Sequence, residues 1–126
     1  MDYVRKIGPF HTDDRGWLAY LSDPEIKIRD VLYIVSNKGA VRANHYHRKD
    51  IHYIYLVSGK LECTSKNMKD PNSEPVVQVI GPGEMYISPP YIAHKVVALE
   101  DSEFVVLTTE PRDQKNYEED TIRVEL

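Results

Sequence analysis

Short runs of apolar or alternating residues, each closed by Gly, Pro, Asn or Asp, constrain this chain more than any other feature of its sequence. No stretch has helical periodicity, and the runs have the length of β-strands. The Ser58-Gly59 pair predicts a tight hairpin between two of them. Many short strands at this spacing are typical of a sandwich or a barrel. We expect strands at residues 17–21, 31–36, 41–47, 51–57, 61–65, 76–80, 85–88, 94–99 and 104–109.

The length of 126 residues fits one compact domain, residues 1–126, and a hydrophobic content of 41% is enough for a packed core. The core is expected to span about residues 16–110, followed by a charged C-terminal tail over residues 111–126. Three alternatives stay open for this tail. It is a loose end, a short edge strand over residues 121–124, or an arm across a partner subunit.

Charge and cysteine content exclude several classes of protein. A net charge of -4 gives no electrostatic case for binding nucleic acid or an anionic membrane. The single cysteine, Cys63, excludes an internal disulfide framework and a cysteine-rich zinc module, and we expect it to be a small buried side chain. No apolar run has the length of a membrane-spanning helix, and residues 1–9 carry charges and no signal-peptide core. These features predict a cytoplasmic protein.

Four of the five histidines lie between positions 45 and 94. His45 and His47 are two apart on an extended run, so both point to the same face of a strand. His52 opens the next strand, and His94 follows a Pro-Pro turn where another strand begins. In a closed barrel these imidazoles meet in one cavity, where neutral imidazole suits a divalent transition metal. His11 lies outside the group and is expected at the surface.

Here the sequence resembles the cupins, whose two motifs combine glycines with histidines. The first motif is G-x5-H-x-H followed by Glu and Gly. The chain matches it at Gly39, His45, His47 and Gly59, and has His52 in place of the glutamate. The chain matches the second motif at Gly83, Pro89 and His94. It departs from that motif at Tyr91, which replaces the second glycine, and at Ala98, which replaces the asparagine. The resemblance implies an all-β fold, the double-stranded β-helix or jelly-roll barrel, and a homodimer.

The histidine at the glutamate position bears on the identity of the metal. A set of four imidazoles, His45, His47, His52 and His94, favours Zn, Ni, Fe or Cu over Mn, because it supplies no hard anionic ligand. Two alternatives stay open: His52 does not bind the metal, or the site holds no metal and its histidines act as bases.

A narrower resemblance is to nucleotide-sugar epimerases and ketoisomerases of the cupin fold. Residues 13–17 are similar to their D-x-R-G-aromatic segment, and residues 42–46 to their R-G-x-H-Y segment, with Ala43 in place of the glycine. The resemblance implies that Arg15 and Arg42 hold the nucleotide diphosphate. It also implies that a histidine, His45 or His47, removes a proton beside a sugar ketone. Simple alternation places Arg42 on the face opposite His45 unless a bulge intervenes.

The nine tyrosines suit half-buried β surfaces and polar cavities. Packing in the barrel or at its rim is the favoured interpretation for any one of them. Tyr55 is nevertheless predicted as a catalytic residue that returns the proton, and Tyr86 as a substrate contact. Trp17 is interpreted as packing in the core or at an interface.

Together these features predict a metal-binding cupin that isomerises or epimerises a keto sugar or nucleotide sugar in carbohydrate or polysaccharide biosynthesis. Removing a proton next to a ketone needs a base and a positive group beside the developing oxyanion. Two alternatives belong to other classes: an iron-dependent dioxygenase using the same histidines, and a non-catalytic sugar-binding or sensing cupin. The expected partners are a small-molecule ligand and a second copy of the chain.

Overall fold

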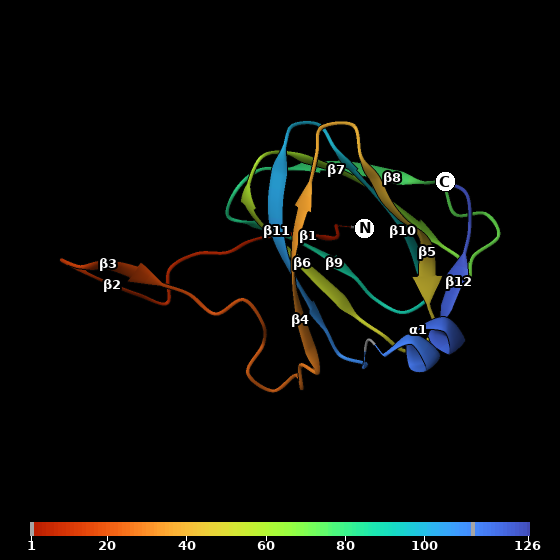
Figure 1. Cartoon of the computed structure of the whole chain (residues 1–126), viewed down its shortest axis with the longest axis horizontal. Coiled ribbons are helices and arrows are strands. Elements are labelled where there is room, and N and C mark those ends of the chain that lie inside the picture. The colour runs from red at the N-terminus through yellow and green to blue at the C-terminus, as the bar shows by residue number, and fades with distance from the viewer. Residues whose placement is uncertain (1, 112) are drawn as a thin grey trace.

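The structure is a computed structural model that describes residues 2–111 and 113–126. Over these residues the chain forms twelve β-strands and one short helix, and the strands pair antiparallel. The predicted all-β jelly-roll barrel is confirmed. Figure 1 shows the two large sheets facing each other, with a small hairpin standing away from them.

The first five-stranded sheet has the order β1-β9-β6-β11-β4. Its strands are β1 (Val4–Lys6), β4 (Asp30–Ser36), β6 (His52–Ser58), β9 (Glu84–Ser88) and β11 (Ser102–Thr108). Alternate residues of β6 and β11 enter the barrel core, while the intervening ones form an outer face that is also apolar. Part of that outer face is covered by the segment between β3 and β4, which contributes Leu21, Ile26 and Ile28.

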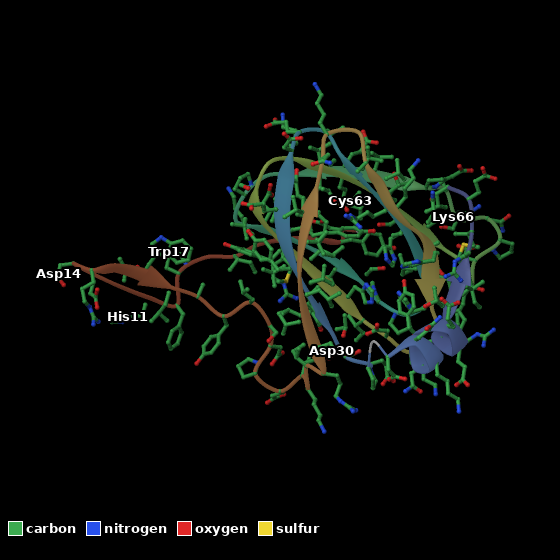
Figure 2. The ribbon with its side chains drawn as sticks, in the orientation of Figure 1. His11, Asp14, Trp17, Asp30, Cys63 and Lys66 are labelled. Carbon is green, nitrogen blue, oxygen red and sulfur yellow. The ribbon has the colours of Figure 1, made fainter. Side chains whose placement is uncertain are left out.

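The second five-stranded sheet has the order β12-β5-β10-β7-β8. Its strands are β5 (Val41–His47), β7 (Leu61–Asn67), β8 (Val76–Ile80), β10 (Ile92–Ala98) and β12 (Thr121–Arg123). The inward-facing residues of both sheets pack together in one hydrophobic core. Cys63 on β7 is completely buried in it, as predicted. Figure 2 places Cys63 within the barrel.

The hairpin after β6 depends on Gly59, the second residue of the predicted turn. Its φ of +99° is a backbone conformation that glycine adopts without strain. An added Cβ would also lie 2.6 Å from the carbonyl oxygen of Asp101. The close approach of two turns at this end of the barrel therefore requires a glycine.

Two short strands, β2 (His11–Asp13) and β3 (Gly16–Leu18), form a separate hairpin that we call the arm. Only the part near 17–18 was expected to be extended. The arm projects from the barrel, and His11, Asp14 and Trp17 all lie on it in Figure 2. Trp17 is 59% exposed, so within one chain it does not pack in the core.

The tail contains the helix α1 (Gln114–Asp120) and then β12, which pairs with β5. The edge-strand interpretation of the tail is confirmed, while the helix was not predicted. A seven-residue helix without a buried residue leaves no apolar stripe for sequence analysis to detect. Figure 1 shows α1 at the end of the barrel where β5 ends.

Candidate functional site

A cavity of about 160 Å³ opens between the two sheets at the end covered by α1. Its apolar lining comes from β4, β6, β10 and β11. The remaining side chains are mostly basic or hydrogen-bonding groups. The polar lining residues are Arg42, His45, His52, His94 and Tyr117.

All four predicted histidines are buried; His45, His52 and His94 line this cavity, and His47 lies beside them. His45 and His47 come from β5, His52 from the start of β6 and His94 from β10. The ring centroids of His45 lie 4.7 Å from those of both His47 and His94, and His47 lies 4.4 Å from His52. The longest separation is 6.4 Å, between His45 and His52. We call these four residues the histidine cluster.

Two groups of residues, one of them within the histidine cluster, have the spacing of metal ligands. One potential ligand atom from each of His45, His47 and His94 lies within 4.8 Å of the others. A second set, within the same limit, is His47, His52 and the carboxylate of Asp50. The first set consists of buried imidazoles alone, which suits a transition metal with open positions for a substrate.

The hydrogen bonds of His94 define which of its nitrogens carries the proton. Ser88 donates its hydroxyl proton to the carbonyl oxygen of Ile92 at 3.2 Å. Ser88 Oγ also lies 2.7 Å from His94 Nδ1, and the carbonyl oxygen of Ile92, which can only accept, lies 3.4 Å from the same nitrogen. A proton on Nδ1 satisfies all three contacts. The Nε2 atom of His94 then carries the lone pair. An outer partner that fixes the tautomer is a regular feature of metal-binding histidines.

The tautomer of His47 is set in the same way, by hydrogen-bond partners from the C-terminal tail. Thr121 donates its hydroxyl proton to the carbonyl oxygen of Tyr117 at 2.5 Å, so its Oγ1 accepts from His47 Nδ1 at 3.3 Å. The carboxylate of Asp120 lies 3.5 Å from the same nitrogen. His47 is therefore also the Nδ1–H tautomer, with its lone pair on Nε2.

His52 has a carboxylate partner that sequence analysis missed. Its Nε2 lies 2.8 Å from Asp50, which is itself buried. Asp50 also accepts bonds from the backbone amides of Thr109 and Glu110. Burial acts to raise the pKa of Asp50, but the bond to His52 and the nearby imidazoles outweigh it, and the pKa is lowered from its ordinary value. The residue is therefore a carboxylate that orients His52.

His94 is neutral in the folded protein. Its complete burial lowers its pKa well below the ordinary histidine value, and charge on His45, His52 or His47 would lower it further. A neutral imidazole is the form that binds a metal.

Arg42 reaches the cavity because of a β-bulge in β5. His45 pairs with His94, but Ala43 pairs with the next residue of β10, which leaves Asn44 as an extra residue. Arg42 and His45 therefore share the inward face, against simple alternation. The guanidinium is fixed by bonds to Ser36 Oγ at 2.6 Å and to the carbonyl oxygen of Val35 at 3.0 Å.

Two departures from the family motifs fall where the backbone is left-handed. Ala43, at the glycine of the R-G-x-H-Y segment, has φ +72°, and Tyr91, at the second glycine of the second motif, has φ +64°. Both residues therefore adopt the conformation for which glycine is the usual choice.

Three predicted residues lie away from the histidine cluster. Tyr55 was predicted as catalytic, but it is on the outer face of β6, opposite His52, because three positions separate them. Tyr86 was predicted as a substrate contact, but it is completely buried in the core, bonded to Ser65, and does not line the cavity. Arg15 is on the arm, paired with Asp13, and a single chain does not bring it to the cavity.

Tyr117 is a cavity residue for which the sequence carried no signal. It comes from α1, and its ring centroid lies 5.7 Å from His47 and 6.2 Å from His45. A polar, charged tail gave no indication of a residue that covers the mouth of a barrel.

Comparison with known families decides the class of the fold. A family model described as the cupin domain matches residues 32–110, well over half of the chain. The chain belongs to the cupin family. The matched region contains both sets of cupin motifs and all four histidines of the cluster. No curated protein matches this cupin.

Solved structures share the fold at low identity. A dTDP-4-dehydrorhamnose 3,5-epimerase from Sulfolobus tokodaii is 23% identical, with a TM-score of 0.72 over 90% of this chain and 72% of that one. A sugar 3,4-ketoisomerase from Thermoanaerobacterium thermosaccharolyticum, in complex with TDP, is 21% identical, with a TM-score of 0.74 over 95% and 85%. An epimerase from Legionella pneumophila in complex with dTDP-4-keto-L-rhamnose is 15% identical, with a TM-score of 0.76 over 99% and 74%.

Within residues 2–111 and 113–126 of this cupin, no helix has the length and apolar character needed to cross a membrane.

Proposed function

We propose that this cupin isomerises or epimerises a keto sugar carried by a nucleotide diphosphate. The observation that carries the proposal is the cavity itself, where Arg42 and the His52–Asp50 pair meet beside three further imidazoles. The cavity is smaller than the roughly 300 Å³ at which sites for drug-sized ligands begin. It therefore suits a single sugar ring, with the nucleotide lying outside.

Such a reaction removes a proton from the carbon next to a ketone and returns it to another carbon or to the other face. His52 is the imidazole suited to accept that proton, because Asp50 holds its Nε2–H and stabilises the imidazolium that forms. This assignment replaces our sequence-based choice of His45 or His47 as the base. Arg42 supplies positive charge toward an oxyanion or a phosphate.

The remaining imidazoles fit a metal. His45, His47 and His94 would hold it, since they are buried, within ligand distance of one another, and two have their outer nitrogens fixed by hydrogen bonds. A bound Zn, Ni, Fe or Cu ion would polarise the ketone as a Lewis acid. Because three histidines suffice, His52 is left to act as the base.

We further propose that the protein works as a homodimer in which the arm of one chain lies on the other. A two-stranded hairpin is marginally stable alone, yet the arm exposes Trp17 and Leu18, and the residues that flank it expose Phe10 and Tyr20. The outer face of β4 exposes a second apolar row, Val31, Tyr33 and Val35. In a two-fold dimer, the arm and the β4 row of each copy would both be covered, and Arg15 would move toward the opening of the partner's cavity.

The named ligands of the solved structures agree with this substrate class. Two are described in complex with TDP or with dTDP-4-keto-L-rhamnose, and both share the barrel of this chain at TM-scores above 0.7. At 21% and 15% identity, they support the proposal through the fold alone.

The decisive experiment is incubation with dTDP-linked 4-keto sugars in D₂O, followed by mass spectrometry and NMR. We expect incorporation of one solvent deuteron beside the ketone, loss of at least 100-fold in rate for His52→Gln and Asp50→Asn, and no loss for Glu119→Gln, an exposed carboxylate. Binding without exchange would instead identify a sugar-binding cupin. Iron-dependent O₂ uptake would identify a dioxygenase.

The metal has a separate test, elemental analysis of the purified protein and of His47→Ala. We expect about one metal ion per chain in the wild type and strong depletion in the variant. Less than about one ion per ten chains after supplementation would contradict the metal proposal and leave the isomerase proposal standing.

A further inference from the structure

The C-terminal segment, which we define as residues 113–126, contacts the histidine cluster at several points although it lies outside the region matched by the cupin family. Tyr117 covers the cavity, Thr121 bonds to His47, and β12 pairs with the part of β5 that carries His45 and His47. The amides of Val124 and Leu126 bond to Asn44, the extra residue of the bulge. The segment is therefore built onto the strand that presents half of the cluster.

Asp120 is the strongest single link between this segment and the site. Its Oδ1 accepts the backbone amides of Arg48 at 3.1 Å and Lys49 at 2.8 Å, and its Oδ2 accepts that of Asp50 at 3.1 Å. One carboxylate thus binds three of the four residues that connect β5 to β6. The same Oδ2 lies 3.5 Å from His47 Nδ1.

The position of Asp120 affects two histidines through different routes. Toward β6, it fixes the backbone at Asp50, the partner of His52. Toward β5, it places Thr121, whose hydroxyl is committed to the carbonyl of Tyr117 and can only accept from His47. Both routes determine which nitrogen of an imidazole faces the cluster.

We propose that Asp120 is a positioning residue that docks the C-terminal segment and, with Thr121, fixes His47 as the Nδ1–H tautomer with Nε2 toward the histidine cluster. The effect on His47 is independent of any ligand. Its use in holding a metal rests on the proposed function above.

The test compares four variants of the full chain. Asp120→Ala removes the acceptor of three amides. Thr121→Val removes, at almost constant volume, the hydroxyl that accepts from His47 and donates to the carbonyl oxygen of Tyr117. Thr121→Ser keeps the hydroxyl and is the conservative rescue. Glu119→Gln changes an exposed neighbouring carboxylate of the same helix and is the control.

The first measurement is the tautomer of His47, from long-range ¹H–¹⁵N correlation spectra of labelled protein treated with a chelator. We expect the Nδ1–H form in the wild type, Thr121→Ser and Glu119→Gln, and a mixture of tautomers in Asp120→Ala and Thr121→Val. Hydrogen exchange at residues 48–50 should increase in Asp120→Ala, with β6 and β11 unchanged. If Asp120→Ala does not fold, Thr121→Val still decides the tautomer.

The second measurement is the affinity and visible absorption spectrum of added Co²⁺. We expect at least tenfold weaker binding in Asp120→Ala and Thr121→Val, in the range typical of lost outer-sphere partners. An unchanged tautomer with Co²⁺ affinity within twofold of the wild type in both variants would overturn the inference. Absence of Co²⁺ binding to the wild type, with the tautomer changes present, would support the positioning role and contradict only the metal proposal.

Discussion

Ala43 shows how a single residue can satisfy a geometry that suits glycine better. Its φ of +72° is needed because the bulge turns Arg42 and His45 to the same face. A left-handed conformation costs a residue with a Cβ about 1–2 kcal/mol, partly offset by the lower unfolded-state entropy of alanine.

We therefore expect Ala43→Gly to stabilise the fold by about 0.5–1 kcal/mol, or by a few degrees in melting temperature. Thermal unfolding followed by circular dichroism measures the effect. Ala40→Gly is the matched control, because its φ is negative, and it should destabilise by about 0.5–1 kcal/mol. Destabilisation by both substitutions would mean that the bulge carries no strain.

Cys63 gives a pH-dependent prediction far from the histidine cluster. Burial, with a smaller contribution from Glu62, raises the pKa of its thiol from 9.0 to about 12. Above pH 9 the thiol ionises in the unfolded chain but not in the folded one. Its contribution to the free energy of unfolding is thus complete below pH 9 and decreases by about 1.4 kcal/mol per pH unit between pH 9 and 12.

Urea titrations at pH 8, 9, 10 and 11 on wild type and Cys63→Ala measure this slope. We expect the difference in stability between the two proteins to shrink as the pH rises above 9. Iodoacetamide should label the wild type only after unfolding, since the folded thiol is buried and protonated. Rapid labelling of folded protein at pH 8 would contradict both expectations.

The residues of the site differ in how far sequence could predict them. The convergence of the four histidines follows from strand alternation and short connections. Strict alternation from His52 would also have placed Tyr55 on the opposite face. Asp50 could not be recognised, because a charged residue before a strand has the pattern of a solvent-exposed loop. Arg42 depended on a bulge that only the pairing register reveals.

At the scale of elements, the turns were the most predictable part of the fold and the two ends of the chain the least. Glycines and polar clusters mark the barrel hairpins because specific backbone angles require them. The arm and α1 are short, so their own periodicity is too weak to detect. The position of α1 is set by the bonds of Asp120 to residues 48–50, which no local pattern encodes.

Two of the turn glycines with a positive φ, Gly39 and Gly59, allow the cost of backbone strain to be measured separately from that of a steric clash. Both have a positive φ, but only at Gly59 would a Cβ approach other atoms closely. We expect Gly39→Ala to cost about 1 kcal/mol from strain alone. Gly59→Ala should cost about 3 kcal/mol or more, because the turn around Asp101 must also move.

Equilibrium urea unfolding of the two glycine variants measures this difference directly. The critical result is the order of stabilities: the free energy of unfolding of the Gly59→Ala variant should be well below that of Gly39→Ala. Equal losses would show that the hairpin and the neighbouring turn separate freely, and that their close approach contributes nothing to the barrel.

For the whole molecule, the arm is the feature that a single barrel does not explain. The sequence contains one tryptophan, Trp17, and it lies on this arm at 59% exposure. If the arm docks on a second copy, the indole moves from water to an apolar surface. Its fluorescence emission therefore reports assembly directly, without any label.

We expect the purified protein to elute with the mass of a dimer and to show blue-shifted tryptophan emission, which moves to longer wavelength on dilution as the dimer dissociates. Leu18→Asp places a charge beside Trp17 at a position 53% exposed in one chain, so the barrel should fold but remain monomeric with red-shifted emission. Val77→Asp, at a position 57% exposed on β8 of the barrel, should leave the dimer intact. A wild-type monomer whose emission is that of a water-exposed indole at all concentrations would contradict the proposal that the arm docks on a second chain. Arg15 would then have no route to a cavity, and Arg42 would be the one predicted phosphate ligand left at the site.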